Sequence, residues 1–301
     1  MPTGLKVFLL IASLAVFAIL GAFHVPTPGD SIGLPGGKQD ITLDALPSLP
    51  AWAHDDLPDF SKYQNVTQKK HAFFSFLYPR IVLANTRILI QRQYLETLER
   101  KSTLAKSEIL WLEQEAERLR VDEEPGSDAM FVQLGKRLDV IPPSLILAQA
   151  ANESAWGTSR FARQGNNLFG QWCFTKGCGL VPQGREAGKQ HEVAAFRSPY
   201  LSIQSYIQNL NSHPSYQLVR NLRSEARSGG QFASGMWLAA GLISYSERGK
   251  EYISEIRSMI SFNKLSDYDQ AFRRALLGND SRPLTQLASA DTEKVLLPDQ
   301  E

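Results

Sequence analysis

The sequence predicts a mostly α-helical protein, and two observations carry this prediction. Apolar side chains recur every three or four residues from about residue 67 to 101 and again from about 107 to 121, which is the period of an amphipathic helix. Pro142 and Pro143 then precede a short apolar segment that ends at Glu153, and proline is well tolerated in the first turn of a helix but not later. We therefore expect a helical hairpin followed by a short buried helix.

Composition allows a sizeable core and does not favour a nucleic-acid partner. The chain has 301 residues, of which 43% are hydrophobic and 21% are charged, so it can form one large domain or a catalytic domain with appendages. Lys and Arg total 32 against 31 Asp and Glu, which gives a formal net charge of +1. Surfaces that bind nucleic acid are strongly basic, and the bulk charge gives no sign of one.

Residues 7–23 form an unbroken run of apolar and small side chains near the amino terminus. This run predicts a secretory signal peptide or a short membrane anchor over residues 1–25. Both alternatives stay open, because only Gly21 and Ala22 offer small side chains beside a cleavage point. Either one exports the rest of the chain, which in a bacterium means the periplasm, and an uncleaved segment would hold the protein on the inner membrane.

Four further segments complete the predicted organisation. Residues 26–62 carry many Pro and Gly residues and no sustained period, which predicts a linker. Residues 63–125 form a helical arm that either binds a partner or packs on the following domain. Residues 126–265 form the domain with the chemical motifs. Residues 266–301 turn polar and are expected to be a tail that can be removed without loss of the fold.

Glu153 is the first candidate for chemistry, because it lies at the carboxyl end of the buried helix. Low dielectric disfavours a charged carboxylate and the helix dipole is negative at that end, so both raise the expected pKa of Glu153. A raised pKa is what a general acid near neutral pH requires. The residues alone leave one alternative open, an ordinary helix-end glutamate paired with Arg160 or Arg163. The aromatic residues that follow and are expected to line a cleft are Trp156, Phe169 and Trp172.

One segment resembles the glucosaminidase family of peptidoglycan hydrolases, a branch of the lysozyme-like superfamily: LILAQAANESAWGTSRFARQGNNLFGQW, residues 145–172. The resemblance continues through QWCFTKGCGLVP, HEVAAFRSPYLSIQSYIQNLNSHPSY and GLISYSERGKEYISEIRSMI, and covers roughly residues 73–265. It implies a lysozyme-like domain of the α+β class, mostly α, with a small β lobe near residues 180–197.

The resemblance implies a role for each matching position. Glu153 corresponds to the general acid that protonates the leaving glycosidic oxygen. Glu192 corresponds to the second acidic residue, a base or stabiliser, with a solvated strand residue as the alternative. Tyr245 is expected near the acid, in contact with substrate or water. The candidates for substrate binding are Trp156, Asn167, Phe169, Trp172 and Tyr252, the last with core packing as its alternative.

Cys173 and Cys178 lie in the segment WCFTKGCG, where they can close a small loop. In an exported chain such a pair predicts a disulfide, which either shapes the cleft beside Trp172 or only closes the loop. A zinc site would need about four ligands, and His191 is the one further candidate nearby, so we expect no metal. No cofactor is indicated.

The expected function is hydrolysis of the β-1,4 bond after N-acetylglucosamine in peptidoglycan glycan strands, as the resemblance implies. Two alternative reactions need no second carboxylate: attack by the substrate's own N-acetyl carbonyl, and lytic transglycosylation to an anhydro product. Two alternatives need no catalysis. One is a wall-binding module, which would have no need of Glu153 and Glu192, and the other is a membrane-tethered scaffold that acts through residues 67–121.

Overall fold

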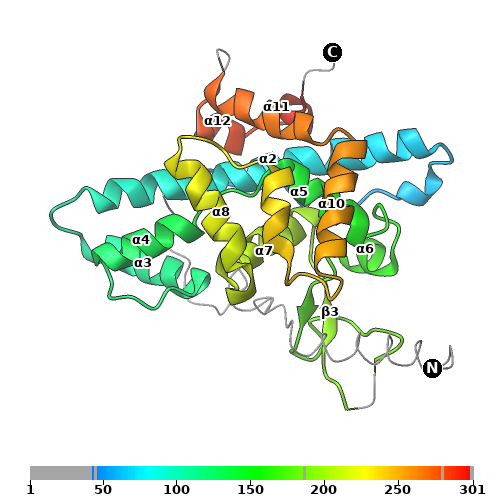
Figure 1. Ribbon diagram of the computed structural model, residues 1–301, viewed down its shortest axis with the longest axis horizontal. Helices are drawn as coiled ribbons and strands as arrows, with labels where there is room; N and C mark the ends of the chain where they lie inside the picture. Colours follow the sequence, from blue (N-terminus) through cyan, green and yellow to red (C-terminus); the bar gives the residue numbers. More distant parts are fainter. Residues whose placement is uncertain (1–42, 44–45, 186–187, 279–280, 299–301) are drawn as a thin grey trace.

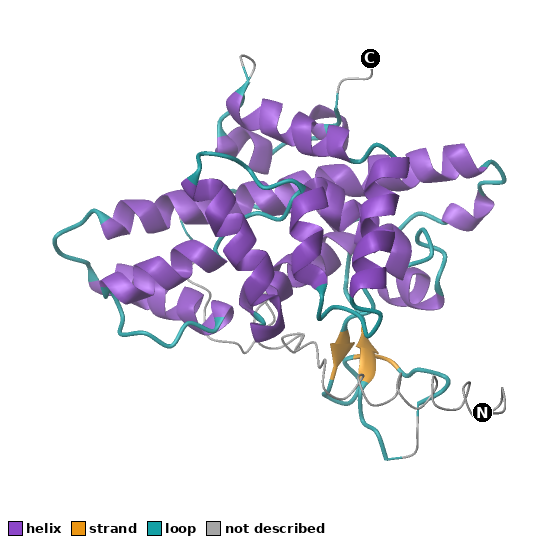
Figure 2. Ribbon diagram, viewed as in Figure 1, coloured by secondary structure: helices purple, strands orange, loops and turns teal. Residues whose placement is uncertain are grey.

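The computed structural model describes residues 43, 46–185, 188–278 and 281–298. Helices dominate, as Figure 1 shows, and the described strands form one small sheet at an edge of the molecule (Figure 2). The predicted mostly α, α+β class is confirmed. The candidate export segment and the first part of the predicted linker lie outside the described residues.

The helices follow one another along the chain as α2 (Val66–Glu99), α3 (Lys106–Leu119), α4 (Asp128–Arg137), α5 (Pro143–Glu153), α6 (Arg160–Gly165), α7 (Pro199–Ser212), α8 (Gln217–Ser228), α9 (Gly235–Leu238), α10 (Lys250–Phe262), α11 (Ser266–Leu277) and α12 (Leu284–Ala288). Short 3-10 turns are η1 (Ala51–His54), η2 (Phe60–Lys62), η3 (Pro214–Tyr216), η4 (Ala239–Leu242) and η5 (Glu293–Leu296).

The small sheet consists of β1 (Trp172–Cys173), β2 (Gly179–Leu180) and β3 (Glu192–Ala194). The strands lie in the order β1-β3-β2, and both neighbouring pairs are antiparallel. The sequence places the β lobe near residues 180–197, but its first strand begins earlier, at Trp172. Strands β1 and β2 lie on opposite edges of β3 and therefore run in the same direction.

The hairpin predicted for residues 63–125 is present as α2 and α3, but α2 is not a separate arm. From Phe73 to Ile90, α2 contributes to the main hydrophobic core, and it packs against α5, α7 and α12. Its last turns form a second core with α3 and α4. In the described part of the chain, one helix, α2, is long and apolar enough to cross a membrane. However, 78% of its apolar window is buried inside the fold, as in the core helix of a globular protein.

The described parts of the predicted linker and of the predicted tail both pack on α2. In η1, the Nε1 of Trp52 donates to the carbonyl oxygen of Ala290 at 2.8 Å. Arg80 of α2 is fully buried and donates to Trp52 O at 2.8 Å and to Glu293 Oε1 at 3.0 Å. The described residues of 266–298 therefore pack on the core, and whether the fold survives their removal stays a prediction. A few apolar side chains and one buried arginine hold this segment, although it shows no long helical period.

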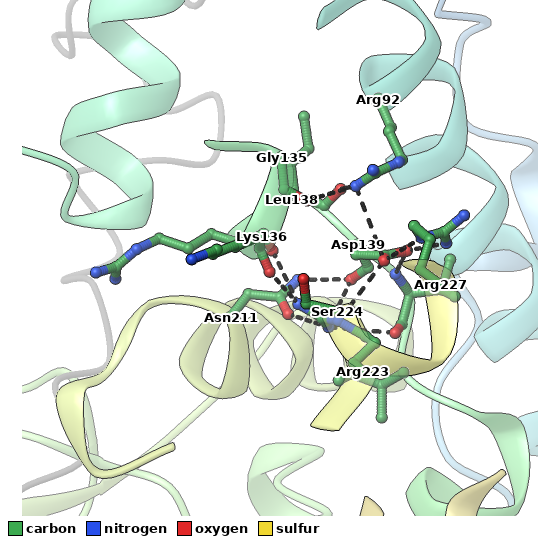
Figure 3. Close-up of polar contacts among 12 residues, drawn as sticks. Arg92, Gly135, Lys136, Leu138, Asp139, Asn211, Arg223, Ser224 and Arg227 are labelled. Atoms are coloured by element: carbon green, nitrogen blue, oxygen red, sulfur yellow. Dashed lines mark hydrogen bonds and ion pairs between the residues drawn. The ribbon is translucent and has the colours of Figure 1, made fainter. Parts of the chain in front are cut away.

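Figure 3 shows a buried polar cluster around Asp139, where the chain leaves α4 and runs toward α5. Arg227 pairs with both carboxylate oxygens of Asp139, and Arg92 and Arg223 each lie 3.8 Å from its Oδ2. Burial would raise the pKa of Asp139, but the three arginines together hold it below its usual value. Arg223 also donates to Lys136 O at 2.9 Å, near the end of α4. The cluster thus fixes the segment that leads into α5.

Candidate active site

Helix α5 carries Glu153, and its start is capped from a distant part of the chain. Pro142 stands at the N-cap and offers no side-chain acceptor. Instead, Asp269 of α11 accepts the N–H of Ser144 at 2.8 Å and its hydroxyl at 2.6 Å. A carboxylate at this end satisfies free N–H groups and suits the helix dipole. The segment expected to be a tail therefore helps to hold the helix that carries Glu153.

Helix α5 ends at Glu153, and the turn that follows is left-handed at three successive residues. Ala155, Trp156 and Gly157 have φ angles of 50°, 60° and 73°. Residues with a side chain adopt such angles only where their surroundings hold them. Here the Ser154 hydroxyl accepts the N–H of Gly157 at 2.8 Å, which closes the turn. The helix thus ends at Glu153, where the sequence places its carboxyl end.

Trp156 anchors this turn to α2. Its ring centroid lies 5.7 Å from that of Phe73 and 5.4 Å from that of Phe74, edge-on in both cases. Glycine is required at position 157, because a Cβ at Gly157 would come within 2.6 Å of the ring of Phe60. Trp156 is half-buried, and the substrate contact that we expected for it stays a prediction.

The side chain of Glu153 is half-buried, and its carboxyl group is hydrogen-bonded. Its Oε1 accepts the hydroxyl of Tyr252 from α10 at 2.8 Å and the Nδ2 of Asn152 at 3.3 Å. Burial raises the pKa of Glu153, and the two hydrogen bonds offset this only in part. The direction predicted from the buried helix end is therefore confirmed, with burial as the main cause. No ion pair joins Glu153 to Arg160 or Arg163 in the described part of the chain.

A chain of buried polar side chains continues behind Tyr252. The Nε2 of Gln149 donates to the Tyr252 hydroxyl at 2.8 Å, and the Tyr206 hydroxyl donates to the Oε1 of Gln149. Gln149 is 0% exposed and Tyr206 is 1% exposed. Neither residue was predicted from the sequence as part of the site. Gln149 had a usable signal, because it precedes Glu153 by four residues and so lies on the same face of α5.

Two further predicted residues lie close to this chain. Tyr245 stacks on Tyr252 with ring centroids 5.2 Å apart and an angle of 9°, and its hydroxyl donates to Phe169 O at 3.3 Å. Phe169 is 2% exposed and stacks on Tyr206 at 4.0 Å. Phe169 and Tyr252 therefore shape the site from inside the core, whereas Tyr245 is partly exposed.

Glu192 lies in the β lobe, where the disulfide loop holds it. Its Oε1 accepts the N–H of Gly177 at 3.0 Å and its Oε2 that of Gly179 at 2.8 Å. The hydrogen bond from Gly177 is the largest cause that holds the pKa of Glu192 below its usual value, and the one from Gly179 adds to it. The carboxylate therefore stays ionised. Cys173 and Cys178 form the predicted disulfide, which closes this loop. The loop thus fixes the position of the carboxylate, which is 5% exposed.

Asn167 is buried and uses its whole amide group on the backbone. Its Nδ2 donates to Gln171 O at 2.9 Å and Ala194 O at 2.8 Å, while its Oδ1 accepts two N–H groups of the same turn. Asn167 therefore clamps the turn before β1, a different role from the substrate contact that we expected. Trp172 is half-buried in β1 and stacks on His191 at 4.2 Å.

Cys173, Cys178 and Glu192 also form a cluster whose potential ligand atoms lie within 4.8 Å of one another. The two sulfur atoms are bonded to each other, so neither is a free thiolate. The cluster therefore does not fit a metal ion while the disulfide is formed.

The region from α4 to α10 matches a known family. It contains Glu153 and both residues that donate to it, Asn152 and Tyr252. Residues 128–265 match the glucosaminidase family model, described as mannosyl-glycoprotein endo-beta-N-acetylglucosaminidase. The chain belongs to the glucosaminidase family, as its motifs predict, and the family implies a glycosidase related to peptidoglycan.

A particular relative is Protein bax of Escherichia coli (strain K12), to which the chain is 32% identical over 209 residues. The aligned region covers 69% of this chain and 74% of the relative. No solved structure is a significant match.

Proposed function

We propose that the protein cleaves the β-1,4 glycosidic bond after N-acetylglucosamine in peptidoglycan, with Glu153 as the general acid. The environment of Glu153 carries this proposal, because its side chain is half-buried and its carboxyl group has a raised pKa and is fixed on one side by Tyr252. A carboxyl group that keeps its proton toward neutral pH can transfer it to the leaving glycosidic oxygen as the bond breaks.

Glu192 is our candidate for the second carboxylate. The pKa of Glu192 is lowered, whereas that of Glu153 is raised. Glu192 is therefore ionised under conditions in which Glu153 is protonated. Opposite shifts of this kind are typical of an acid and its charged partner. In this role, Glu192 either activates the attacking water or stabilises the positive charge that develops on the sugar.

A second candidate reaction needs only one enzyme carboxylate. Both oxygens of Glu192 are hydrogen-bonded to the loop and the residue is 5% exposed, which leaves little room for an attacking water. This observation favours attack by the substrate's N-acetyl carbonyl, or lytic transglycosylation, with Glu153 alone as the acid. Tyr245 and Trp172, both partly exposed, remain our candidates for contacts with the sugar or its N-acetyl group.

We further propose that the protein works in the periplasm, exported by the apolar run at residues 7–23 and held on the inner membrane if this run is not cleaved. The disulfide supports export, because such bonds persist in oxidising compartments.

Digestion of purified peptidoglycan, followed by mass spectrometry of the fragment ends, tests the proposal. Wild-type protein is expected to release fragments with reducing N-acetylglucosamine ends, and Glu153→Gln should be slower by on the order of 10²- to 10⁴-fold, the usual contribution of a general acid. The matched control is Glu251→Gln, which changes an exposed glutamate of α10 and should leave the rate unchanged.

The products also decide between the two reactions. A large loss in Glu192→Gln supports a second carboxylate, whereas a near wild-type rate supports the one-carboxylate reactions. Anhydro ends would identify a transglycosylase. If neither wild type nor Glu153→Gln releases fragments, the proposal of catalysis is wrong and a wall-binding module is the better account.

A further inference from the structure

The hydrogen bonds behind Glu153 all run in one direction. The Tyr206 hydroxyl donates to Gln149 Oε1, Gln149 Nε2 donates to the Tyr252 hydroxyl, and the Tyr252 hydroxyl donates to Glu153 Oε1. A tyrosine hydroxyl has a single proton, whereas an amide offers donors only on its nitrogen and an acceptor only on its oxygen. With the Tyr206 hydroxyl donating to the amide oxygen, the amide nitrogen faces Tyr252. The one proton of Tyr252 is then left for Glu153.

The packing around this chain keeps it closed. Gln149 is 0% exposed, and Tyr206 and Tyr252 are each 1% exposed. Solvent water therefore does not reach these side chains to take the place of a hydrogen-bond partner. Phe169 covers the ring of Tyr206, and Tyr245 covers the ring of Tyr252, both in stacked contact. The three polar residues come from three helices, α5, α7 and α10, so their geometry depends on the assembled core.

We propose that Gln149 and Tyr206 are positioning residues that act through Tyr252: they direct its hydroxyl proton to Glu153 and so hold the Glu153 carboxyl group in one place. The catalytic meaning of this inference rests on the proposed role of Glu153 as the acid. Without Tyr206, the amide of Gln149 is free to turn its oxygen toward Tyr252. Tyr252 would then donate to Gln149 and withdraw its hydrogen bond from Glu153.

The charged and titratable groups that face Glu153 are Tyr206, Tyr216, Tyr245, Arg248, Tyr252 and Glu255. Burial raises the pKa of Glu153, the Tyr252 hydrogen bond lowers it, Arg248 lowers it and Glu255 raises it. Removal of the Tyr252 hydrogen bond therefore leaves burial less opposed. We expect the pKa of Glu153 to rise in any variant in which Tyr252 no longer donates to it.

The test compares Tyr206→Phe, Tyr252→Phe and the double variant. Infrared difference spectra against the same protein with Glu153→Gln isolate the carboxyl band of Glu153, which is titrated without substrate. Both single variants should shift the titration to higher pH, and Tyr206→Phe should add nothing in the Tyr252→Phe background, since it acts through that residue. The basic limb of the kcat/KM profile should move in the same direction, and the plateau kcat should fall on the order of tenfold as positioning is lost.

The matched control is Tyr200→Phe, which removes another buried hydroxyl from α7 and should leave the titration of Glu153 unchanged. If Tyr206→Phe lowers stability or activity but leaves the Glu153 titration in place, the inference is wrong. The inference is also wrong if Tyr206→Phe still shifts the titration of Glu153 in the Tyr252→Phe background. If Glu153→Gln digests peptidoglycan normally while the titration shifts occur, the proposed function fails but the hydrogen-bond chain stands.

A second measurement decides the matter should Tyr206→Phe not fold. In the wild-type protein labelled with nitrogen-15, the side-chain amide signals of Gln149 should follow the titration of Glu153, because Tyr252 links the two. These signals should lose that pH dependence in Glu153→Gln. Signals of Gln149 that ignore the Glu153 titration in the wild type would overturn the inference.

Discussion

Glu153 shows at the residue scale how burial and charge oppose each other. The residue ends a buried helix, and burial is the largest cause of its raised pKa. Ionising it in the folded protein therefore costs more than ionising it in the unfolded chain, where its pKa is near 4.5. A buried carboxyl group of this kind therefore lowers the stability of the folded protein when it is ionised.

This cost gives a prediction for Glu153→Gln. The folded pKa of Glu153 lies above the unfolded one, so between the two values the folded protein binds more protons, and the wild type loses stability as pH rises through this window. Above the folded pKa the loss is complete, and below the unfolded pKa it is absent. Thermal unfolding from about pH 4 to about pH 8 should therefore show a stabilised glutamine variant whose advantage grows with pH and then levels off. Equal melting temperatures throughout this range would contradict the account.

Some roles of single residues followed from the sequence and others did not. The raised pKa of Glu153 was predictable, because a helix end and a buried helix are local features. Asn167 and Phe169 were expected to contact substrate, but a motif does not tell which side of a turn faces the core. Gln149 stood on the correct face of its helix and was overlooked, because its function depends on Tyr206, a residue 57 positions away.

At the scale of elements, α5 depends on α11 for its cap. Asp269 accepts the N–H and hydroxyl of Ser144 and also the N–H of Gly235 at the start of α9, at 3.2 Å. One carboxylate thus joins the beginnings of two helices to a third, which ties the position of Glu153 to a segment beyond the family match.

Asp269→Ala should accordingly destabilise the fold. The substitution removes the cap of α5 and leaves buried donors unpaired, which together cost about 2 kcal/mol. Asp267→Ala is the matched control, because Asp267 is exposed on the same helix. Urea unfolding measures both variants. If Asp269→Ala is as stable as Asp267→Ala, the cap contributes nothing and the proposed link between α11 and α5 fails.

The elements themselves were predictable to different degrees. Long amphipathic periods correctly predicted α2 and α3, and the paired prolines marked the start of α5. Helix α8 was missed after the break at His213 and Pro214, where the chain resumes a helix within a few residues. The extent of the β lobe could not be predicted, because two-residue strands carry almost no pattern.

At the scale of the whole molecule, segments from both ends of the described chain close around α2. Arg80 of α2 donates hydrogen bonds to Trp52 and Glu293, and Trp52 donates one to Ala290. These bonds join a segment before α2 to one more than 200 residues later. Composition suggested a linker and a tail because polar segments usually lie outside a core. The contacts that bind them are long-range and involve few residues, so no local pattern reveals them.

The central claim is that this assembled fold holds Glu153 as a general acid, and a change of leaving group tests it most directly. An acid matters only when the leaving oxygen needs a proton, and a dinitrophenyl group departs without one. Rates of Glu153→Gln relative to wild type should be compared on peptidoglycan and on a dinitrophenyl chito-oligosaccharide. We predict a large loss on peptidoglycan and a much smaller loss on the activated glycoside. Equal losses on the two substrates, or no loss on peptidoglycan, would contradict the account.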